Sequence, residues 1–292
     1  MKKHHAKRAL LVGLNHYPDP ANNLKGCVND VLMSSQHLQN NYGFAVEDIR
    51  LLTDERATTA NIRKRLAWLA SDMLPGDVVV FHYSGHGSQV RDRDGDELKD
   101  HLDEIICPYD LNWDDPITDD ELGKTFANVP EGASVTVILD SCHSGTGLKE
   151  FGPTPRRDKF IVPPPDIFHR AGPTIADKGV NRSLTMVEPK KELPLQVLAK
   201  SLAEKQRAIL IAACRANQLS ADAWIDGDYH GALTYYFWRS AQSLGWNVTY
   251  KEAVHKTSDF LKADNYEQVP QLEGPGGKWK LFAPLVSAAR AA

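Results

Sequence analysis

Two apolar runs, each followed at once by a turn of small residues, constrain the fold of this chain more than any other feature. Residues 77–83 (DVVVFHY) lead into residues 84–87 (SGHG), and residues 135–140 (VTVILD) lead into residues 141–145 (SCHSG). Runs of this length and β-branched content are typical of strands buried in a parallel sheet. Parallel strands end at one edge of the sheet, where open α/β folds place their functional sites. We therefore expect the imidazole of the first turn and the thiol of the second to meet there.

The rest of the chain alternates between short apolar strands and stretches with helical periodicity. Thr58 or Thr59 is the predicted N-cap of one helix, whose inner face carries Ile62, Leu66 and Leu69. Strands are expected at residues 9–13, 49–52, 77–83, 135–140, 208–213 and 279–282, and helices at residues 28–38, 59–69, 118–130, 195–204, 232–243 and 250–262. This order predicts an α/β fold class with a mainly parallel central sheet flanked by helices on both faces.

Composition and charge narrow the class of protein. With 292 residues, 42% hydrophobic and 25% charged, the chain is typical of a globular protein, long enough for one large domain or two small ones with a substantial core. Its net charge of −4 gives no general attraction to nucleic acid or to an anionic membrane. The cysteines have no CxxC spacing, which argues against a zinc ribbon or a disulfide framework. Residues 1–8 are basic but lack the apolar stretch of a signal peptide, so we expect a cytoplasmic protein without membrane association.

A long segment interrupts the alternation of strands and helices. Prolines and basic residues are interleaved from residue 146 to residue 193, without apolar periodicity. This composition predicts an exposed loop or linker between two structured parts of the chain.

The chemistry expected at the sheet edge is that of a thiol with a neighbouring base. Cysteine is nucleophilic as the thiolate, and a histidine on an adjacent strand end can take its proton. We therefore predict Cys142 as the nucleophile and His86 as the general base. The main-chain N–H groups of Gly87 and Cys142 could together hold an oxyanion.

Other interpretations of these residues stay open at this point. A single buried cysteine is most often a small hydrophobic residue, and a histidine in a glycine-rich turn is most often structural. His143 is a rival base, but neighbouring residues that leave a strand point to opposite sides. Ser141 or Ser144 could be the nucleophile, although neither lies in a GxSxG elbow. His82 and His86 are spaced like a zinc pair, but the glutamate of that motif is absent.

Four short motifs in order carry a resemblance to a known family. They are residues 24–30 (LKGCVND), 83–87 (YSGHG), 140–145 (DSCHSG) and 213–222 (ACRANQLSAD). With them the chain resembles a metacaspase, a cysteine peptidase of the caspase clan, in its compact prokaryotic form. The resemblance implies a caspase-haemoglobinase fold in a single domain, residues 1–292. Its expected parts are a large-subunit-like part (7–150), a Pro-rich and basic linker loop (151–194) and a small-subunit-like part (195–285).

The resemblance also implies a substrate class. Metacaspases cleave protein or peptide substrates after Arg or Lys, and their pocket for the basic side chain corresponds here to Asp30 and Asp140, lined by Cys27 and Ser84. A guanidinium group is well matched by carboxylates that can pair with it, and Asp140 stands two residues from Cys142. Read without the family, Asp30 could equally be a carboxylate that caps a helix. Metacaspases are generally monomeric, so we expect a monomer.

Calcium is the one cofactor that the sequence suggests. Residues 92–104 are rich in carboxylates, whose oxygens are suitable calcium ligands, although they do not complete an EF-hand. Many metacaspases are activated by calcium, and the resemblance maps that site onto Asp103, Asp119 and Asp120. The fourth carboxylate of the family would fall near Lys149, a departure that Glu150 only partly mends.

Two further expectations concern how the protein acts. A peptidase specific for Arg or Lys, with basic residues in an exposed loop beside its own active site, could cleave itself there, and Arg182 and Lys190 are plausible sites. The alternative from another class is a caspase-like binding or scaffold protein that keeps the fold without turnover. A hydrolase of small amides also remains possible from the residues alone.

Overall fold

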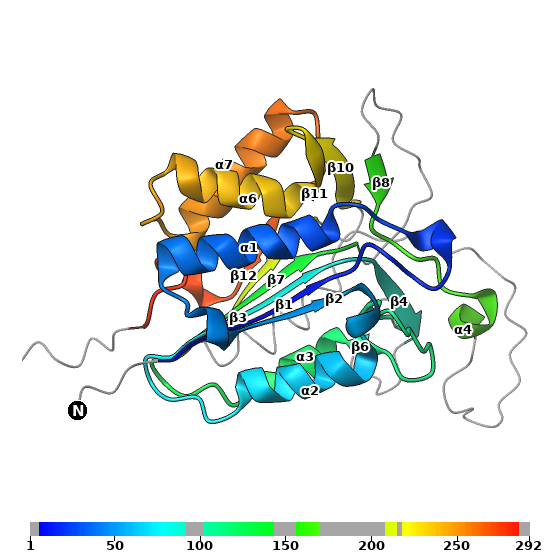
Figure 1. Ribbon diagram of the computed structural model, residues 1–292, viewed down its shortest axis with the longest axis horizontal. Coiled ribbons are helices and arrows are strands. Elements are labelled where there is room, and N and C mark those ends of the chain that lie inside the picture. Colours follow the sequence, from blue (N-terminus) through cyan, green and yellow to red (C-terminus); the bar gives the residue numbers. More distant parts are fainter. Residues whose placement is uncertain (1–5, 92–101, 143–155, 170–207, 215–217, 286–292) are drawn as a thin grey trace, which may run out of the picture.

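A six-stranded sheet forms the centre of the computed structural model, which describes residues 6–91, 102–142, 156–169, 208–214 and 218–285 (Figure 1). The strand order is β12-β9-β7-β3-β1-β2, and all neighbours are parallel except β12 and β9. The sheet strands are β1 (Lys7–Gly13), β2 (Ile49–Thr53), β3 (Val78–Ser84), β7 (Ser134–Asp140), β9 (Ala208–Ala212) and β12 (Gln271–Glu273). The expected mainly parallel α/β sheet is confirmed.

Helices cover both faces of the sheet, as the sequence predicts. Figure 1 shows α1, α6 and α7 on one face and α2 and α3 on the other. The main helices are α1 (Cys27–Tyr42), α2 (Thr59–Ala70), α3 (Asp119–Thr125), α6 (Ala232–Ser243) and α7 (Tyr250–Ala263). Thr58 is the N-cap of α2, and its side chain accepts a hydrogen bond from the N–H of Asn61. Gly43 ends α1 in the left-handed region, with φ of 70°.

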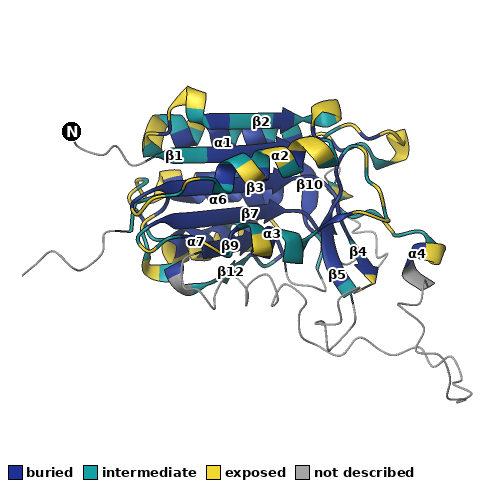
Figure 2. Ribbon diagram, turned by 90° about the horizontal axis from the view of Figure 1, so that it is seen from below, coloured by how far each residue is buried: buried dark blue, intermediate teal, exposed yellow. Residues whose placement is uncertain are grey.

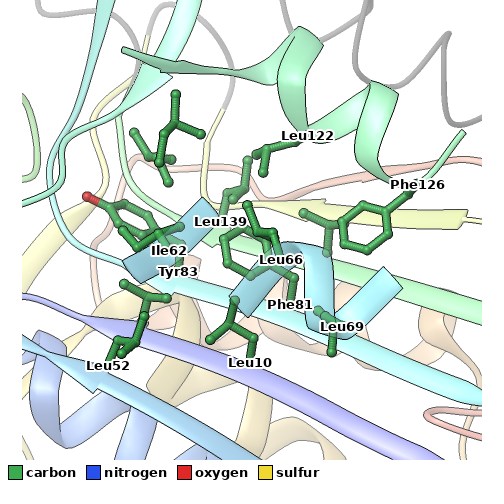
Figure 3. Packing of buried hydrophobic residues seen from close by; sticks show 14 of the residues in the cluster. Leu10, Leu52, Ile62, Leu66, Leu69, Phe81, Tyr83, Leu122, Phe126 and Leu139 are labelled. Carbon is green, nitrogen blue, oxygen red and sulfur yellow. The ribbon is translucent and has the colours of Figure 1, made fainter. Parts of the chain in front are cut away.

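The alternation of side chains along the central strands divides the core in two. Every residue of β3 and of β7 is buried, which Figure 2 shows as dark strands between the helices. Phe81 and Tyr83 point toward α2 and α3 and pack with Leu66 and Leu122 (Figure 3). Val80 lies on the opposite face, with the core under α1, α6 and α7. The same alternation places Ser84, the last residue of β3, and Asp140, the last residue of β7, on the face under α1 and α6.

Two smaller sheets lie at the carboxyl end of the main strands (Figure 1). One contains β4 (Gly87–Arg91), β5 (Leu102–Ile106) and β6 (Ile117–Thr118), and the other contains β8 (Arg156–Asp158), β10 (Ala221–Ile225) and β11 (Asp228–Gly231). A short helix, α4 (Pro165–His169), follows β8. Both small sheets are antiparallel. They surround the edge at which the sequence predicts the functional site.

The structure corrects two expectations. The last strand of the sheet is β12 and not residues 279–282, where Phe282 has φ of 50°, a left-handed conformation that an extended strand does not adopt. The predicted exposed loop is wrong at residues 156–159, because residues 156–158 form a strand and Lys159 is fully buried. The predicted helix at 195–204 lies outside the described residues. Within the described segments, no helix has the length and apolarity needed to cross a membrane.

Candidate active site

The turns that follow β3 and β7 bring the predicted catalytic residues to one place. β3 and β7 are parallel neighbours that end in register, and His86 and Cys142 each follow two residues beyond the strand end. The main-chain N–H groups of Gly87 and Cys142 donate to the same atom, the carbonyl oxygen of Lys159, at 3.0 and 3.1 Å. Two N–H donors that converge on one carbonyl oxygen are the arrangement needed to stabilise an oxyanion.

A backbone carbonyl orients the ring of His86. Nε2 of His86 lies 2.7 Å from the carbonyl oxygen of Asn22. Because a carbonyl only accepts hydrogen bonds, Nε2 carries the ring proton and Nδ1 is the basic nitrogen. Nδ1 is buried and has no hydrogen-bond partner among the residues that the structure describes. The role of Asn22 could not be predicted from the sequence, because a main-chain oxygen does not depend on the identity of its residue.

The surroundings of His86 keep its ring neutral. Burial lowers the pKa of His86 to about 4, with a further lowering from the charges of Arg157 and Lys159, while the hydrogen bond to Asn22 partly opposes the shift. The imidazole is therefore uncharged at neutral pH. Only a neutral imidazole can accept a proton from a thiol, so this setting suits a general base.

The thiol of Cys142 is held by the main chain of Ser220, the residue before β10. Cys142 is fully buried. The N–H of Ser220 donates to its Sγ, and Sγ lies 3.4 Å from the carbonyl oxygen of Ser220. A second cysteine, Cys214, has its pKa raised well above the usual value, first by a hydrogen bond with Cys142 and then by burial. Cys214 therefore stays protonated beside the candidate nucleophile.

A pocket with two carboxylates lies under α1 and α6, and a lysine of the chain itself occupies it. Asp30 and Asp140 are fully buried. Nζ of Lys159 lies 3.0 Å from Oδ1 of Asp140 and 3.4 Å from Oδ2 of Asp30. It also donates to Oγ of Ser84 at 2.9 Å. The charge of Lys159 further acts on the buried thiol of Cys27, whose pKa burial raises well above the usual value. The structure thus brings together the four residues predicted for the pocket.

Hydrogen bonds from neighbouring elements fix both carboxylates. Asp140 accepts from Oγ of Ser220 at 2.7 Å, and from Oγ1 and N–H of Thr234 at 2.7 and 2.9 Å. Asp30 accepts from the N–H of Gly231 at 2.9 Å. The side chain of Asp30 is therefore directed into the pocket, and the N-cap of its own helix is Gly26, which has no side-chain cap. Both acids are held in place to receive a cation.

The ion pairs in this pocket outweigh the cost of burying their charges. Burial has the largest single effect and by itself would lower the pKa of Lys159, but the charges of Asp140, Cys27, Asp30 and Asp222 together raise the pKa of Lys159 well above its usual value. Burial would raise the pKa of Asp140, but Lys159 and the hydrogen bonds from Ser220 and Thr234 lower it. All these shifts favour a charged basic side chain between charged acids.

Asp222 is a further acid near the pocket to which the sequence assigned no role. It accepts from the N–H groups of Lys25 and Gly26 at 2.7 and 2.8 Å, and so ties the loop before α1 to β10. Burial raises the pKa of Asp222, and the charge of Lys159 partly opposes that shift. The two motifs that contain these residues, 24–30 and 213–222, therefore lie together at the site.

Two of the three residues predicted for calcium are buried carboxylates. Asp103 and Asp119 are 8% and 6% exposed, and Asp120 pairs with Lys124 at 3.1 Å. Across the described segments, no group of three or more His, Cys, Asp or Glu side chains could hold a metal ion. Nε2 of His82, a residue of the zinc-like pair in the sequence, lies 3.2 Å from Oγ1 of the α6 residue Thr234.

Several sequence expectations fall on residues that the structure does not describe. These are the rival base His143, the rival nucleophile Ser144, the proposed processing residues Arg182 and Lys190, and the calcium-related positions Lys149 and Glu150. Ser141, the other rival nucleophile, is 2% exposed.

Comparison with known sequences finds one family. Residues 7–150 match the family model described as "Metacaspase, peptidase C14 domain". Metacaspase-1 of Schizosaccharomyces pombe is 33% identical over 288 residues, which covers 91% of this chain and 66% of the relative. Metacaspase-1A of Aspergillus terreus is 34% identical over 286 residues, which covers 91% of this chain and 70% of the relative. The chain thus spans about two thirds of the length of these fungal relatives.

Comparison with solved structures agrees. A crystal structure of a protein from Geobacter sulfurreducens has a TM-score of 0.66 and 25% identity, and covers 96% of this chain and 100% of that one. Caspase-1 from Spodoptera frugiperda has a TM-score of 0.53 and 13% identity, with 92% and 86% of the two chains covered. At that identity the likeness to caspase-1 shows the fold alone, which is caspase-like, as the sequence predicts.

Proposed function

Because the chain belongs to the metacaspase family of cysteine peptidases, we propose that it cleaves protein or peptide chains on the carboxyl side of Lys or Arg, with Cys142 and His86 as its catalytic pair. One observation carries the proposal. The amides of Gly87 and Cys142 bind a carbonyl oxygen whose own residue, Lys159, extends its ammonium group to Asp140. A basic side chain and its carbonyl thus fit the two parts of the site at once.

The mechanism is acyl transfer through a thioester. Nδ1 of His86 takes the proton of the Cys142 thiol, and the thiolate attacks the carbonyl carbon that follows the basic side chain. The N–H groups of Gly87 and Cys142 stabilise the oxyanion. His86 then gives the proton to the leaving amine. Water next attacks the thioester while His86 takes a proton from it, and His86 returns this proton to the sulfur of Cys142 as the acyl group leaves. The neutral, carbonyl-anchored ring of His86 supports this role.

Hydrolysis of fluorogenic peptides tests the catalytic pair. We expect Cys142→Ala and His86→Ala each to lower kcat/KM on an Arg-terminated peptide by at least about 10³-fold, because each removes a part of one catalytic unit. His143→Ala is the matched control and should keep the wild-type rate. Full activity in either of the first two variants, or its loss in His143→Ala, would transfer the role to another residue.

The same assay tests the substrate class. Peptides that end in Arg or Lys should be cleaved and a matched Asp peptide should not, because Asp30 and Asp140 repel an anion. Asp30→Asn should lower the rate on both basic peptides. A chloromethyl ketone with a basic side chain should label Cys142 covalently; labelling nowhere, together with no hydrolysis, is the result expected of a silent scaffold.

Three further parts of the proposal concern calcium, the oligomeric state and the cellular location. We propose that Asp103, Asp119 and Asp120 bind calcium, because two of these three carboxylates, Asp103 and Asp119, are buried. In that case, calcium added after treatment with EDTA should restore the activity of the wild type but not of Asp119→Asn. We propose a monomer that acts in the cytoplasm. The four cysteines, none of which forms a disulfide, support a reducing compartment. The net charge of −4 disfavours nucleic acid as a partner. We also propose that the enzyme cleaves its own chain.

A further inference from the structure

Lys159 does not only place its side chain in the acidic pocket; its backbone is bound as well. Its N–H donates to the carbonyl oxygen of Ser220 at 3.1 Å, and its carbonyl oxygen receives the two N–H groups of Gly87 and Cys142. Each polar group of this residue therefore has a partner in the site. None of these contacts depends on the residue being part of the same chain.

The residues on both sides of Lys159 are also bound in extended form. β8 pairs antiparallel with β10, with Asp158 opposite Ala221 and Arg157 opposite Asp222. On the other side, the N–H of Ile161 donates to the carbonyl oxygen of Gly87 at 3.0 Å. An extended segment that adds a strand to a sheet edge, with one side chain in a specific pocket, is a common way to bind a peptide.

We infer that residues 156–161 are bound as a substrate and that the peptide bond between Lys159 and Phe160 is the site at which the protein cleaves itself. This inference rests on the proposed function, and it assigns the cleavage site to a bond that the sequence did not single out. While the bond is intact, the segment fills the pocket and the pair of amides, so the uncleaved protein is closed to other substrates.

The reaction needs no other reagent than water. The thiol of Cys142 first leaves Ser220, and His86 takes its proton. Sγ then bonds to the carbonyl carbon of Lys159, and the bond from that carbon to the nitrogen of Phe160 breaks. The proton passes from His86 to this nitrogen, which becomes a new amino terminus. Water adds to the thioester, which releases Lys159 as a carboxylate and restores the thiol.

The burial of Lys159 predicts that the cleavage is intramolecular. The side chain is fully buried, so a second enzyme molecule cannot reach it in the folded protein. The rate should therefore not depend on protein concentration. Cys142→Ala protein should stay intact when it is mixed with active wild type.

Sequencing of new amino termini after incubation is the main test. We expect wild-type fragments that begin with Phe160, and the same fragments from Lys159→Arg, which keeps the charge. Lys159→Ala should lose this terminus, whereas the control Lys178→Ala, in the same proline-rich and basic stretch of the sequence, should keep it. Termini only at other positions, or an unchanged Phe160 terminus in Lys159→Ala, would overturn the assignment.

A proline variant guards against the case in which Lys159→Ala fails to fold. Phe160→Pro keeps the lysine in its pocket and makes the bond after it resistant to cleavage, and the N–H that it removes has no part in the pairing with Gly87. We expect a folded protein, shown by its thermal unfolding, that neither cleaves itself nor hydrolyses peptides. Peptide hydrolysis at the wild-type rate in Phe160→Pro would contradict the closed state of the uncleaved protein.

The time course separates this inference from the proposed function. Wild type should hydrolyse a Lys-terminated peptide after a lag that matches the appearance of the Phe160 terminus. If the wild type hydrolyses the peptide without a lag and the Lys159–Phe160 bond stays intact, the inference fails and the proposed function stands. If no variant hydrolyses any basic peptide and no terminus forms, the proposed function fails.

Discussion

Gly231 is the residue at which the shape of the basic pocket depends on a missing side chain. A Cβ atom added there would collide with Nζ of Lys159 and Oδ2 of Asp140, and would lie 2.5 Å from Oδ2 of Asp30. Any larger residue at position 231 would therefore occupy the space of the ammonium group of Lys159. Close packing of this kind is sensitive to a single methyl group.

We predict that Gly231→Ala lowers kcat/KM for Lys- and Arg-terminated peptides by roughly 100-fold, because the basic group can no longer reach both acids. The measurement is steady-state hydrolysis, with thermal unfolding to confirm the fold. Gly277→Ala is the control, since a Cβ there would meet no atom closer than 3.8 Å. Equal activities of the two variants would show that the pocket can hold the added methyl group together with a basic side chain, contrary to this prediction.

The site residues differ in how far the sequence could predict them. His86 and Cys142 follow apolar strands, so physical reasoning alone could propose them, whereas Asp30 was assigned through the resemblance. Asn22 acts through its carbonyl oxygen, which has no signature in the sequence. Lys159 lies among other basic residues in a segment that is rich in proline, and only the three-dimensional contacts distinguish it from them.

At the scale of elements, a single turn of 3-10 helix holds the ring of His86, the proposed general base. Residues Pro20–Asn22 form this turn, and its N-cap, Asp19, accepts a hydrogen bond from the N–H of Ala21 at 2.9 Å. The turn ends on the carbonyl that orients His86. Arg157 also donates to the carbonyl oxygen of Ala21, so the bound segment helps to hold the turn.

We predict that Asp19→Ala lowers kcat by up to about fivefold and leaves KM nearly unchanged, because a lost cap of about 1 kcal/mol loosens the carbonyl without altering the substrate pocket. Asn112→Ala is a matched control, since Asn112 accepts a hydrogen bond from the N–H of Asp114 in a different turn. An increase in KM with kcat unchanged would mean that Asp19 acts on substrate binding.

The elements that the sequence predicted are those with a clear apolar period. The strands β1, β2, β3, β7 and β9 and the helices α1, α2, α6 and α7 are confirmed within a few residues of their expected bounds. β8 could not be predicted, because Arg156–Asp158 has no apolar residue and is extended only through its pairing with β10. Residues 279–282 have strand-like composition, but their only bridge joins Lys280 to Thr249.

At the scale of the whole molecule, buried histidines link folding to pH. His82 is fully buried in β3, and burial lowers its pKa from 6.5 to about 4. Below pH 6.5 the unfolded chain binds a proton at this position that the folded chain does not bind. The stabilisation is therefore complete above pH 6.5 and is lost as the pH falls toward 4.

We predict that His82 accounts for a loss of about 2 kcal/mol in unfolding free energy between pH 7 and pH 5. Urea unfolding of a Cys142→Ala background, with and without His82→Asn, measures this difference. The loss should be smaller by that amount when His82 is replaced. His255→Asn, at an exposed position, should leave the loss unchanged; an equal loss in the His82 variant would mean that other groups govern acid unfolding.

The pocket of Asp30 and Asp140 has a consequence for the protein after the cleavage that we infer at Lys159. Once Lys159 departs, two carboxylates remain side by side where water screens them poorly, and their mutual repulsion opposes the compact state. Every basic group that enters relieves that repulsion. We therefore expect the cleaved protein to be most rigid while a basic side chain fills the pocket and least rigid while the pocket is empty.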